Sequence, residues 1–332
     1  MTTPHRTPET SAPPAAADTR DDPDLRGTWY ILPSPFDVAG ELDTASLGRL
    51  VDAAIGWGVD GLTALGVMAE PASLTAAERA AVLRTIVEVA AGRVPIAVGC
   101  SGTTVASVVA LGRQAQVSGA AAVMVAAPTL LRNLDALPAF YAQVAAGIGL
   151  PLIVQDEPAA TGVVIPLSIL LACLRSSGAR TVKLEDPPTP TKIGQLLAAE
   201  PGLAIFGGLG GTAALWELER GSCGTMTGFA YPEILRAVRL AVEAGASDRA
   251  GRLFDRYLPL ILFEAQPVVG LAIRKELLRR RGVLTHAGTR SFGGSFDGSL
   301  GGSLDPATLH ALDAVLDRLG IAPSVDAFVP TW

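Results

Sequence analysis

Eight short apolar runs, rich in β-forming residues, alternate with Ala- and Leu-rich segments of helical period from residue 28 onward. This alternation predicts parallel strands that are covered by helices. The clearest of the seven helical segments between the runs is 75–91, which opens with the capping pattern Thr75-Ala76-Ala77-Glu78. We expect strands at residues 28–35, 61–66, 95–101, 121–128, 151–158, 180–186, 203–208 and 223–229.

Eight strand–helix units favour one closed barrel. An open doubly wound sheet would carry the fingerprint GxGxxG after its first strand, and that pattern is missing here. We therefore predict an α/β fold, a (β/α)8 TIM barrel over residues 27–246 with a C-terminal helical appendage over 247–332. The appendage contains a Gly/Ser-rich loop at 286–304, and the Pro- and Ala-rich residues 1–26 are predicted to be a disordered tail.

Composition excludes several classes of partner. The net charge of −6, with both signs interspersed, offers no basic surface for nucleic acid or an anionic membrane. Every apolar stretch is broken before it reaches the ~20 residues of a membrane span, so we expect a cytoplasmic protein. Cys100, Cys173 and Cys223 are isolated in apolar stretches, which predicts reduced core residues and no metal site.

Lysine is rare in this chain, which has only Lys183, Lys192 and Lys275 among 26 basic residues. Lys192 and Lys275 fall on predicted helices, where we expect solvated side chains. Lys183 lies in the second half of the sixth predicted strand, near the barrel end at which such folds carry their chemistry. Lys183 is therefore the candidate for a chemical role.

Strand alternation places Val182 and Leu184 on one face of the sixth strand and Lys183 with Glu185 on the other. If the apolar pair packs under the helices, Lys183 and Glu185 point into the barrel mouth. Partial removal from water disfavours a charged amine, and a neutral amine can form a Schiff base with a ketone. The alternative is a purely structural salt bridge between Lys183 and a neighbouring carboxylate.

Several segments, taken in order, resemble the pyruvate-dependent class I aldolases that include dihydrodipicolinate synthase and N-acetylneuraminate lyase. The resemblance covers roughly residues 27–320 and places Lys183, within VKLED, at the Schiff-base lysine. It rests on SPF (34–36), GVMAEPASLT (66–75), QDEP (155–158), VKLED (182–186) and ERGSCGTMTGFAYPE (219–233).

The chain departs from this family at the residues that carry protons. A strand-five tyrosine and a loop threonine of the family are replaced by Gln155 and by Val67 or Met68. A glutamine amide can orient a group by hydrogen bonding but cannot act as an acid or base. The second relay tyrosine is also missing from residues 127–133, and Ala160 stands where dihydrodipicolinate synthase has an arginine, so we discount that activity.

Nearby carboxyl groups are the candidates for proton transfer, because a poorly solvated carboxyl can protonate a departing hydroxyl or deprotonate the carbon beside an iminium. Glu185 is the leading candidate, and Asp156 and Glu157 end the adjoining strand. Glu70 is assigned to loop support. The predicted catalytic residues are Lys183, Glu185, Gln155 and Asp156, and the predicted substrate-binding residues are Gly66, Val67, Met68, Gly208 and Thr227.

These residues predict a lyase that forms a Schiff base with a 2-oxo acid such as pyruvate and performs reversible aldol cleavage or condensation with an aldehyde. Dehydration of a 2-oxo-3-deoxy acid by the same iminium is the alternative. The iminium is the electron sink, so no metal or organic cofactor is implied. The resemblance also implies a homo-oligomer, a dimer or tetramer.

Two other classes of function stay open. The loss of the tyrosine relay is compatible with a barrel that binds an oxo acid without turnover. Asp156, Glu157 and Glu185 could instead hold a divalent metal for enolate chemistry.

Overall fold

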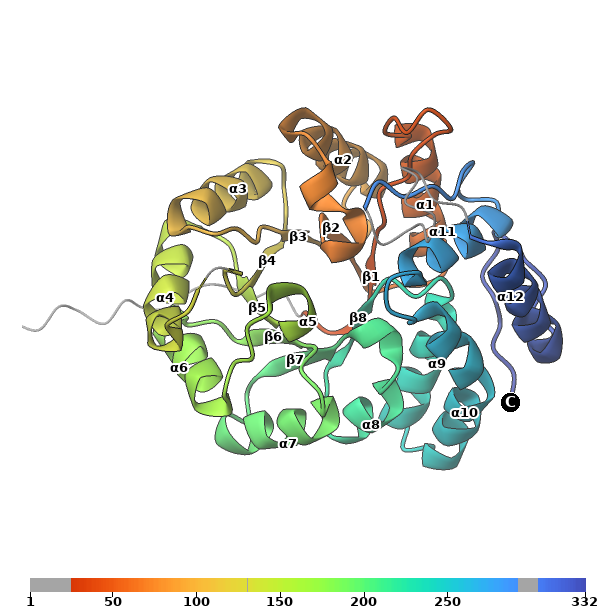
Figure 1. Cartoon of the computed structure of the whole chain (residues 1–332). Coiled ribbons are helices and arrows are strands. Elements are labelled where there is room, and N and C mark those ends of the chain that lie inside the picture. Colours follow the sequence, from red (N-terminus) through yellow and green to blue (C-terminus); the bar gives the residue numbers. More distant parts are fainter. Residues whose placement is uncertain (1–24, 130, 292–303) are drawn as a thin grey trace, which may run out of the picture.

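A closed barrel of eight parallel strands forms the centre of the molecule, in a computed structural model that describes residues 25–129, 131–291 and 304–332. The strands pair in chain order and β1 pairs with β8, which closes the sheet (Figure 1). All eight predicted strands are present, each shorter than the apolar run that predicted it, because residues at one or both ends of each run lie in the adjoining loops. The strands are β1 Gly27–Ile31, β2 Gly61–Ala64, β3 Ile96–Gly99, β4 Ala122–Ala126, β5 Leu152–Asp156, β6 Thr181–Leu184, β7 Ala204–Gly207 and β8 Gly224–Thr227.

Helices surround the barrel and cover the outer faces of the strands (Figure 1). The predicted capping box begins α2, where the Thr75 N–H donates to Glu78 Oε2 at 2.8 Å and the Glu78 N–H donates to Thr75 Oγ1. The α-helices are α1 Thr44–Gly56, α2 Ala76–Ala90, α3 Val105–Val117, α4 Leu137–Gly147, α5 Pro158–Thr161, α6 Leu167–Ser177, α7 Thr189–Ala199, α8 Ala214–Glu219, α9 Pro232–Glu243, α10 Ser247–Glu264, α11 Gly270–Arg280 and α12 Pro306–Leu319. Short 3-10 turns are η1 Val67–Ala69, η2 Pro71–Ser73, η3 Leu134–Ala136 and η4 Leu209–Gly211.

Strand alternation separates two apolar layers. Val182 and Leu184 belong to the large layer between sheet and helices, as predicted, whereas Trp29, Phe206 and Met226 fill the inside of the barrel. Leu25 also packs in this inner layer and is buried. The predicted tail therefore extended too far, because an apolar side chain at residue 25 seals the barrel interior; residues 1–24 lie outside the described part of the chain.

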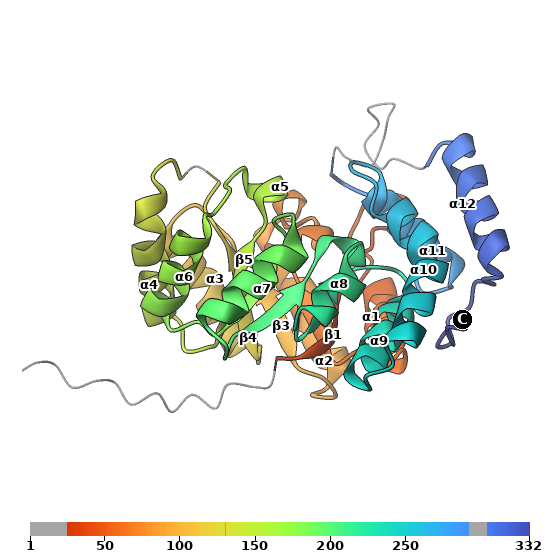
Figure 2. The ribbon, with the colours of Figure 1, turned by 90° about the horizontal axis from the view of Figure 1, so that it is seen from below.

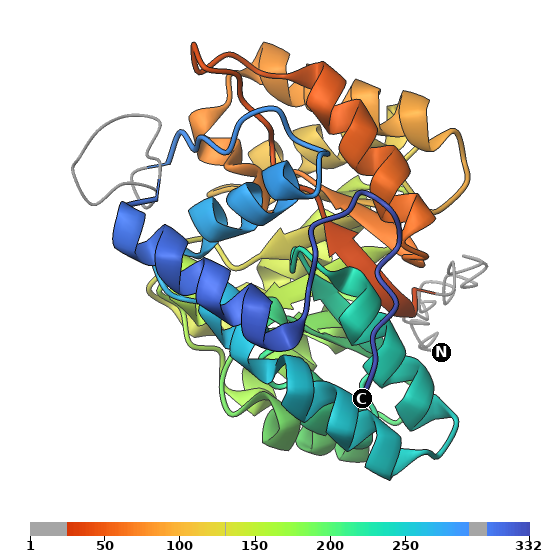
Figure 3. The same ribbon diagram turned by 90° about the vertical axis from the view of Figure 1, so that its right-hand side faces the viewer.

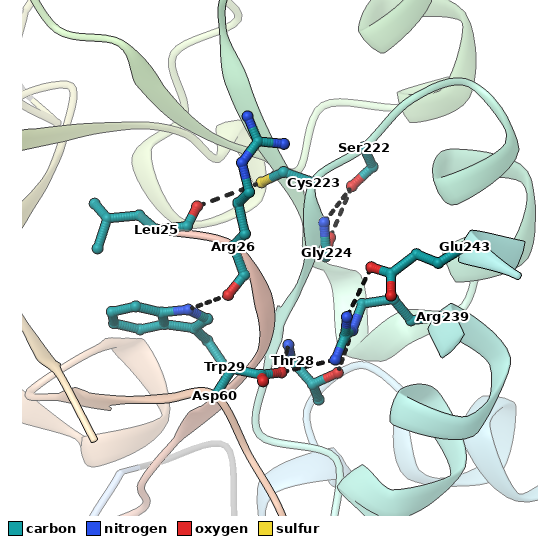
Figure 4. A network of polar contacts seen from close by, with 10 residues as sticks. All are labelled: Leu25, Arg26, Thr28, Trp29, Asp60, Ser222, Cys223, Gly224, Arg239 and Glu243. Carbon is teal, nitrogen blue, oxygen red and sulfur yellow. Dashed lines mark hydrogen bonds and ion pairs between the residues drawn. The ribbon is translucent and has the colours of Figure 1, made fainter. Parts of the chain in front are cut away.

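A polar network joins the amino-terminal ends of β1, β2 and β8, opposite the end at which Lys183 lies (Figure 4). Arg239 on α9 donates to Asp60 Oδ2 at 2.8 Å and to Thr28 Oγ1 at 3.2 Å. Asp60 also accepts the Thr28 backbone N–H at 2.7 Å. The network fixes the helix to the seam that closes the barrel.

In the part of the chain that the structure describes, three helices follow the barrel on one side of the molecule, with α12 alongside α10 and α11 outside the barrel (Figure 3). Figure 2 shows α11 near the same end of the barrel as α5. Of the predicted Gly/Ser-rich loop, residues 292–303 lie outside the described part. The three cysteines are buried and free, as predicted. None of the helices in the described ranges is long and apolar enough to cross a membrane.

Candidate active site

Lys183 and Glu185 lie together at the carboxyl end of β6. Both are buried, with 3% and 7% of their surface exposed, and Lys183 Nζ is 2.8 Å from Glu185 Oε2. Both side chains nevertheless line a cavity of about 710 Å³, so a small molecule can reach the amine. The predicted orientation of this pair into the barrel mouth is confirmed. The salt bridge that sequence analysis offered as an alternative is also present, and it lies inside the cavity.

Gln155 connects Glu185 to a second carboxyl group. It is paired with Lys183 in the register of β5 and β6, so both side chains enter the barrel at the same level. Gln155 Nε2 donates to Glu185 Oε2 at 2.9 Å and to Glu157 Oε2 at 2.5 Å. Glu157 lines the same cavity as Lys183. One amine, one amide and two carboxyl groups thus form a continuous cluster.

The surroundings of Glu157 favour its protonated form. Burial, with repulsion from the Glu185 carboxylate, raises the pKa of Glu157 to about 7. The charge of Lys183 and the hydrogen bond from Gln155 oppose this rise. A carboxyl group with this pKa can donate or accept a proton near neutral pH.

Asp156 is not brought into this cluster, although it was a predicted catalytic residue. It lies on the opposite face of β5, where its Oδ2 accepts from Lys192 Nζ at 2.6 Å. Lys192 also donates to Asp186 Oδ2 at 2.8 Å and is buried, so the expectation of a solvated side chain was wrong. The three carboxyl groups of Asp156, Glu157 and Glu185 therefore do not meet at one point, because Asp156 lies on the other face of the strand. Within the described residues, no three His, Cys, Asp or Glu side chains are grouped to hold a metal ion.

Hydrogen bonds to Glu70 hold the loop that carries Gly66, Val67 and Met68 in place. Glu70 Oε1 accepts from Lys275 Nζ at 2.6 Å, and Glu70 Oε2 accepts the backbone N–H groups of Arg290 and Ser291 at 2.7 and 2.6 Å. Lys275 is fully buried, which corrects the second expectation of a solvated lysine. Helical periodicity alone could not predict that Lys275 would pair with the carboxylate of Glu70, 205 residues away in the chain.

The predicted substrate-binding residues take different positions. Val67, Met68 and Thr227 line the 710 Å³ cavity. Gly66 instead lines a cavity of about 120 Å³ on another side of its loop, together with Val67 and Gln155. Gly208 makes room for Glu185, because a Cβ at residue 208 would lie 2.3 Å from Glu185 Cγ. The adjacent Leu209 N–H donates to Glu185 Oε1 at 3.1 Å.

Sequence reasoning missed an ion pair in the opposite wall of the cavity. Arg274 on α11 donates from Nε to Glu264 Oε1 at 2.5 Å, and its Nη1 contacts Met68 Sδ. Both charged residues line the cavity. Burial raises the pKa of Glu264 while Arg274 opposes that rise. These residues come from the C-terminal helices, which carry no motif that points toward the barrel mouth.

Comparisons with known proteins agree with the fold and with the family resemblance of the sequence. A family model described as "Dihydrodipicolinate synthetase family" matches residues 24–291. L-2-keto-3-deoxyarabonate dehydratase from Azospirillum brasilense is 35% identical over 270 residues, which cover 79% of this chain and 86% of that protein. 4-Hydroxy-tetrahydrodipicolinate synthase 1 from Streptomyces coelicolor is 31% identical, with coverage of 72% and 77%.

A solved structure is also similar. The crystal structure of dihydrodipicolinate synthase from Rhodopseudomonas palustris has a TM-score of 0.82 and 34% identity, and the match covers 88% of this chain and 97% of that one. Fold and sequence identity both agree with the family resemblance seen in the sequence. The chain belongs to the dihydrodipicolinate synthetase family and is an enzyme of the class I aldolase type.

Proposed function

We propose that this enzyme forms a Schiff base between Lys183 and a 2-oxo acid and then removes water from a 2-oxo-3-deoxy acid. One observation carries the choice of reaction: two carboxyl groups, Glu185 and Glu157, line one cavity with the amine and are connected through Gln155. Among the described residues that line this cavity there is no tyrosine. A carboxyl pair supports both a base at C3 and an acid at the departing hydroxyl.

Schiff-base formation begins with transfer of a proton from Lys183 Nζ to Glu185 across their 2.8 Å contact. The neutral amine attacks the carbonyl carbon, C2, of the oxo acid. Glu185 then returns the proton to the oxygen of the carbinolamine, which leaves as water. The product is an iminium, and Glu185 is again a carboxylate beside it.

The Glu185 carboxylate is placed to take the next proton, from C3, which converts the iminium to an enamine. Expulsion of a hydroxyl from C4 then gives a conjugated iminium, and hydrolysis releases an unsaturated 2-oxo acid.

We place the substrate carboxylate against the backbone of Val67 and Met68, because N–H groups at the start of η1 can bind an anion without a particular side chain. The polar tail of the substrate then extends toward Thr227 and Arg274.

The substrate class follows from the same geometry. The Azospirillum relative is named for a five-carbon 2-oxo-3-deoxy acid, which chemically is 4,5-dihydroxy-2-oxopentanoate. A cavity of about 710 Å³ is larger than this molecule requires, so we propose 2-oxo-3-deoxy acids of five or six carbons as the class. Aldol cleavage, the first reading of the sequence, starts from the same iminium but breaks the C3–C4 bond, so it requires a base rather than an acid at the C4 oxygen.

Borohydride trapping tests the Schiff base. We expect pyruvate and borohydride to add one reduced pyruvyl group to the wild-type protein and none to Lys183→Met, whose fold is checked by circular dichroism. Both enantiomers of 4,5-dihydroxy-2-oxopentanoate are then assayed for loss of water and for release of pyruvate. Pyruvate release would identify an aldolase, and absence of any adduct would favour an oxo-acid-binding protein without turnover.

We also propose that the enzyme acts as a homo-oligomer in the cytoplasm, as the family resemblance implies. Light scattering coupled to size-exclusion chromatography checks the oligomer. A mass of one chain at micromolar concentration would contradict it.

A further inference from the structure

Glu157 has fewer cationic and N–H partners than the other acidic residues that line the cavity. A negative charge on its carboxyl group is therefore poorly compensated. It follows β5 directly and precedes the short helix α5. Its carboxyl group lies beside Gln155 and faces the cavity that contains Lys183. The short length of α5 and the proline at its start, Pro158, hold this segment close to the barrel end.

The other carboxylates of the cavity each have strong compensating partners. Glu185 forms an ion pair with Lys183 through one oxygen and accepts from the Leu209 N–H through the other. On the opposite wall, Glu264 accepts from Arg274 and from the Ala230 N–H at 2.9 Å. Each of these two groups therefore has one cationic partner and one backbone N–H partner.

Glu70, the remaining carboxylate of the cavity wall, accepts from Lys275 and from two backbone N–H groups. Glu157 shares the single charge of Lys183 with Glu185, and its own described hydrogen bond comes from the neutral Gln155 amide. Two ionised carboxylates beside one amine would leave an uncompensated buried negative charge. The cluster is therefore neutral when Glu157 retains its proton.

We propose that Glu157 is a further catalytic residue, which protonates the departing C4 hydroxyl and afterwards takes a proton from the water that hydrolyses the product iminium. This role rests on the proposed dehydration. It assigns different duties to the two glutamates. Glu185 exchanges protons with the lysine nitrogen, with C3 and with the oxygen that is lost when the Schiff base forms, whereas Glu157 exchanges protons with the departing C4 oxygen and with the hydrolytic water. Gln155 is a positioning residue that holds the two carboxyl groups through one amide nitrogen.

The protons balance over the cycle. Before C3 deprotonation Glu185 is ionised and Glu157 is protonated. Glu185 takes the C3 proton, the C3–H electrons form the enamine, and the C4–O bond breaks as Glu157 protonates the leaving hydroxyl. A water molecule then adds to C2 and gives one proton to Glu157, while Glu185 returns its proton to the lysine nitrogen. Collapse of the carbinolamine breaks the C2–N bond, and its hydroxyl proton passes by way of Glu185 to the leaving amine. This releases the ketone and restores Lys183, Glu185 and Glu157 to their starting states.

The raised pKa of Glu157, about 7, supports this role. A general acid works best when its pKa lies near the pH of operation. The charged groups that face Glu157 are Lys183 and Glu185 on and after β6, with the Glu264–Arg274 pair across the cavity. We expect the dehydration rate to fall above the pKa, as Glu157 loses the proton that it must donate.

The test is Glu157→Gln, which keeps the size of the side chain and removes its acid. Proton exchange at the methyl group of pyruvate in D2O, followed by NMR, reports Schiff-base formation and C3 deprotonation by Lys183 and Glu185. We expect this exchange and the borohydride adduct to stay within threefold of wild type. Dehydration of 4,5-dihydroxy-2-oxopentanoate should fall about 100-fold or more, and its fall above neutral pH should disappear.

Glu219→Gln, the same change at an exposed residue of α8, is the matched control and should leave all three measurements unchanged. Dehydration by Glu157→Gln within threefold of wild type would overturn the role of Glu157. Loss of adduct and exchange in this variant would overturn it as well, since Glu157 would then act before the enamine forms. If wild type exchanges the protons of pyruvate but dehydrates neither enantiomer, the proposed dehydration is wrong and the role of Glu157 falls with it.

Discussion

Gln155 and Lys183 are direct neighbours across strands β5 and β6, so an uncharged amide lies beside the reactive amine. The amide cannot carry protons, but it donates to both nearby glutamates. The family resemblance predicts a tyrosine at the position of Gln155. In the proposed reaction, the carboxyl pair carries the protons that a phenol would otherwise carry.

Gln155→Leu should change the pH dependence of the reaction. The Gln155 hydrogen bond lowers the pKa of Glu157, so its removal should raise that pKa. We expect the alkaline fall in kcat to move to higher pH, with a smaller kcat because the two carboxyl groups are no longer held in place. A pH–rate profile of variant and wild type measures both effects. If kcat falls at the same pH in both proteins, Gln155 does not act on the titrating group.

Gly208→Ala should displace Glu185. A Cβ at residue 208 would lie 2.3 Å from Glu185 Oε1 as well as from its Cγ, so the glutamate must move. We expect activity to fall about 100-fold, since displacements of 1 Å near reacting groups have effects of this size. Gly251→Ala is the control, because Gly251 lies within α10, a Cβ there would meet no atom within 4 Å, and alanine favours a helix. Equal activity in the two variants would contradict the proposed displacement of Glu185 by a Cβ at residue 208.

Lys192→Met should destabilise the fold. Lys192 neutralises Asp156 and Asp186 and donates to the Ile165 carbonyl at 2.9 Å, so its loss leaves buried Asp156 without a cation. Removal of one partner from a buried ion pair costs about 3–5 kcal/mol of unfolding free energy. Urea unfolding measures this loss, and the double variant Lys192→Met with Asp156→Asn should recover part of it. A cost below about 1 kcal/mol would indicate that water replaces the ammonium group.

Glu217 should make the protein less stable as the pH rises from about 4.5 to about 7. Burial, which outweighs the hydrogen bond from Thr189 Oγ1, raises the pKa of Glu217 to about 7 in the folded state. The folded state thus binds a proton more tightly than the unfolded state, and that stabilisation is lost as the group ionises. A shift of this size corresponds to at most roughly 3 kcal/mol.

Glu217→Gln removes this titration, so we expect a flatter profile of unfolding free energy between pH 5 and 8. The unfolding free energy of the variant minus that of wild type should be larger at pH 8 than at pH 5. Chemical denaturation at the two pH values measures the difference. An unchanged pH profile would assign the pH dependence to other groups, Glu157 among them.

Local patterns predicted most of the barrel and part of the site. The same alternation that placed Lys183 and Glu185 on the inner face of the sixth strand would have separated Asp156 from Gln155 and Glu157, had it been applied to the fifth. Nothing local predicted that Lys192 and Lys275 are buried, because their carboxylate partners Asp156 and Glu70 lie 36 and 205 residues away in the chain.

The sequence by itself determined the strands, the helices and the inward direction of Lys183, since these depend on the spacing of apolar residues along a short segment. Only the tertiary structure decided which carboxyl groups meet around the amine and which are neutralised elsewhere. Closure of the barrel brings β5 against β6, and the C-terminal helices carry Glu264 and Arg274 to the same cavity. The ionisation of Glu157 depends on the pairing of β5 with β6, because burial and the charges of Glu185 and Lys183 together set the energy of its carboxylate.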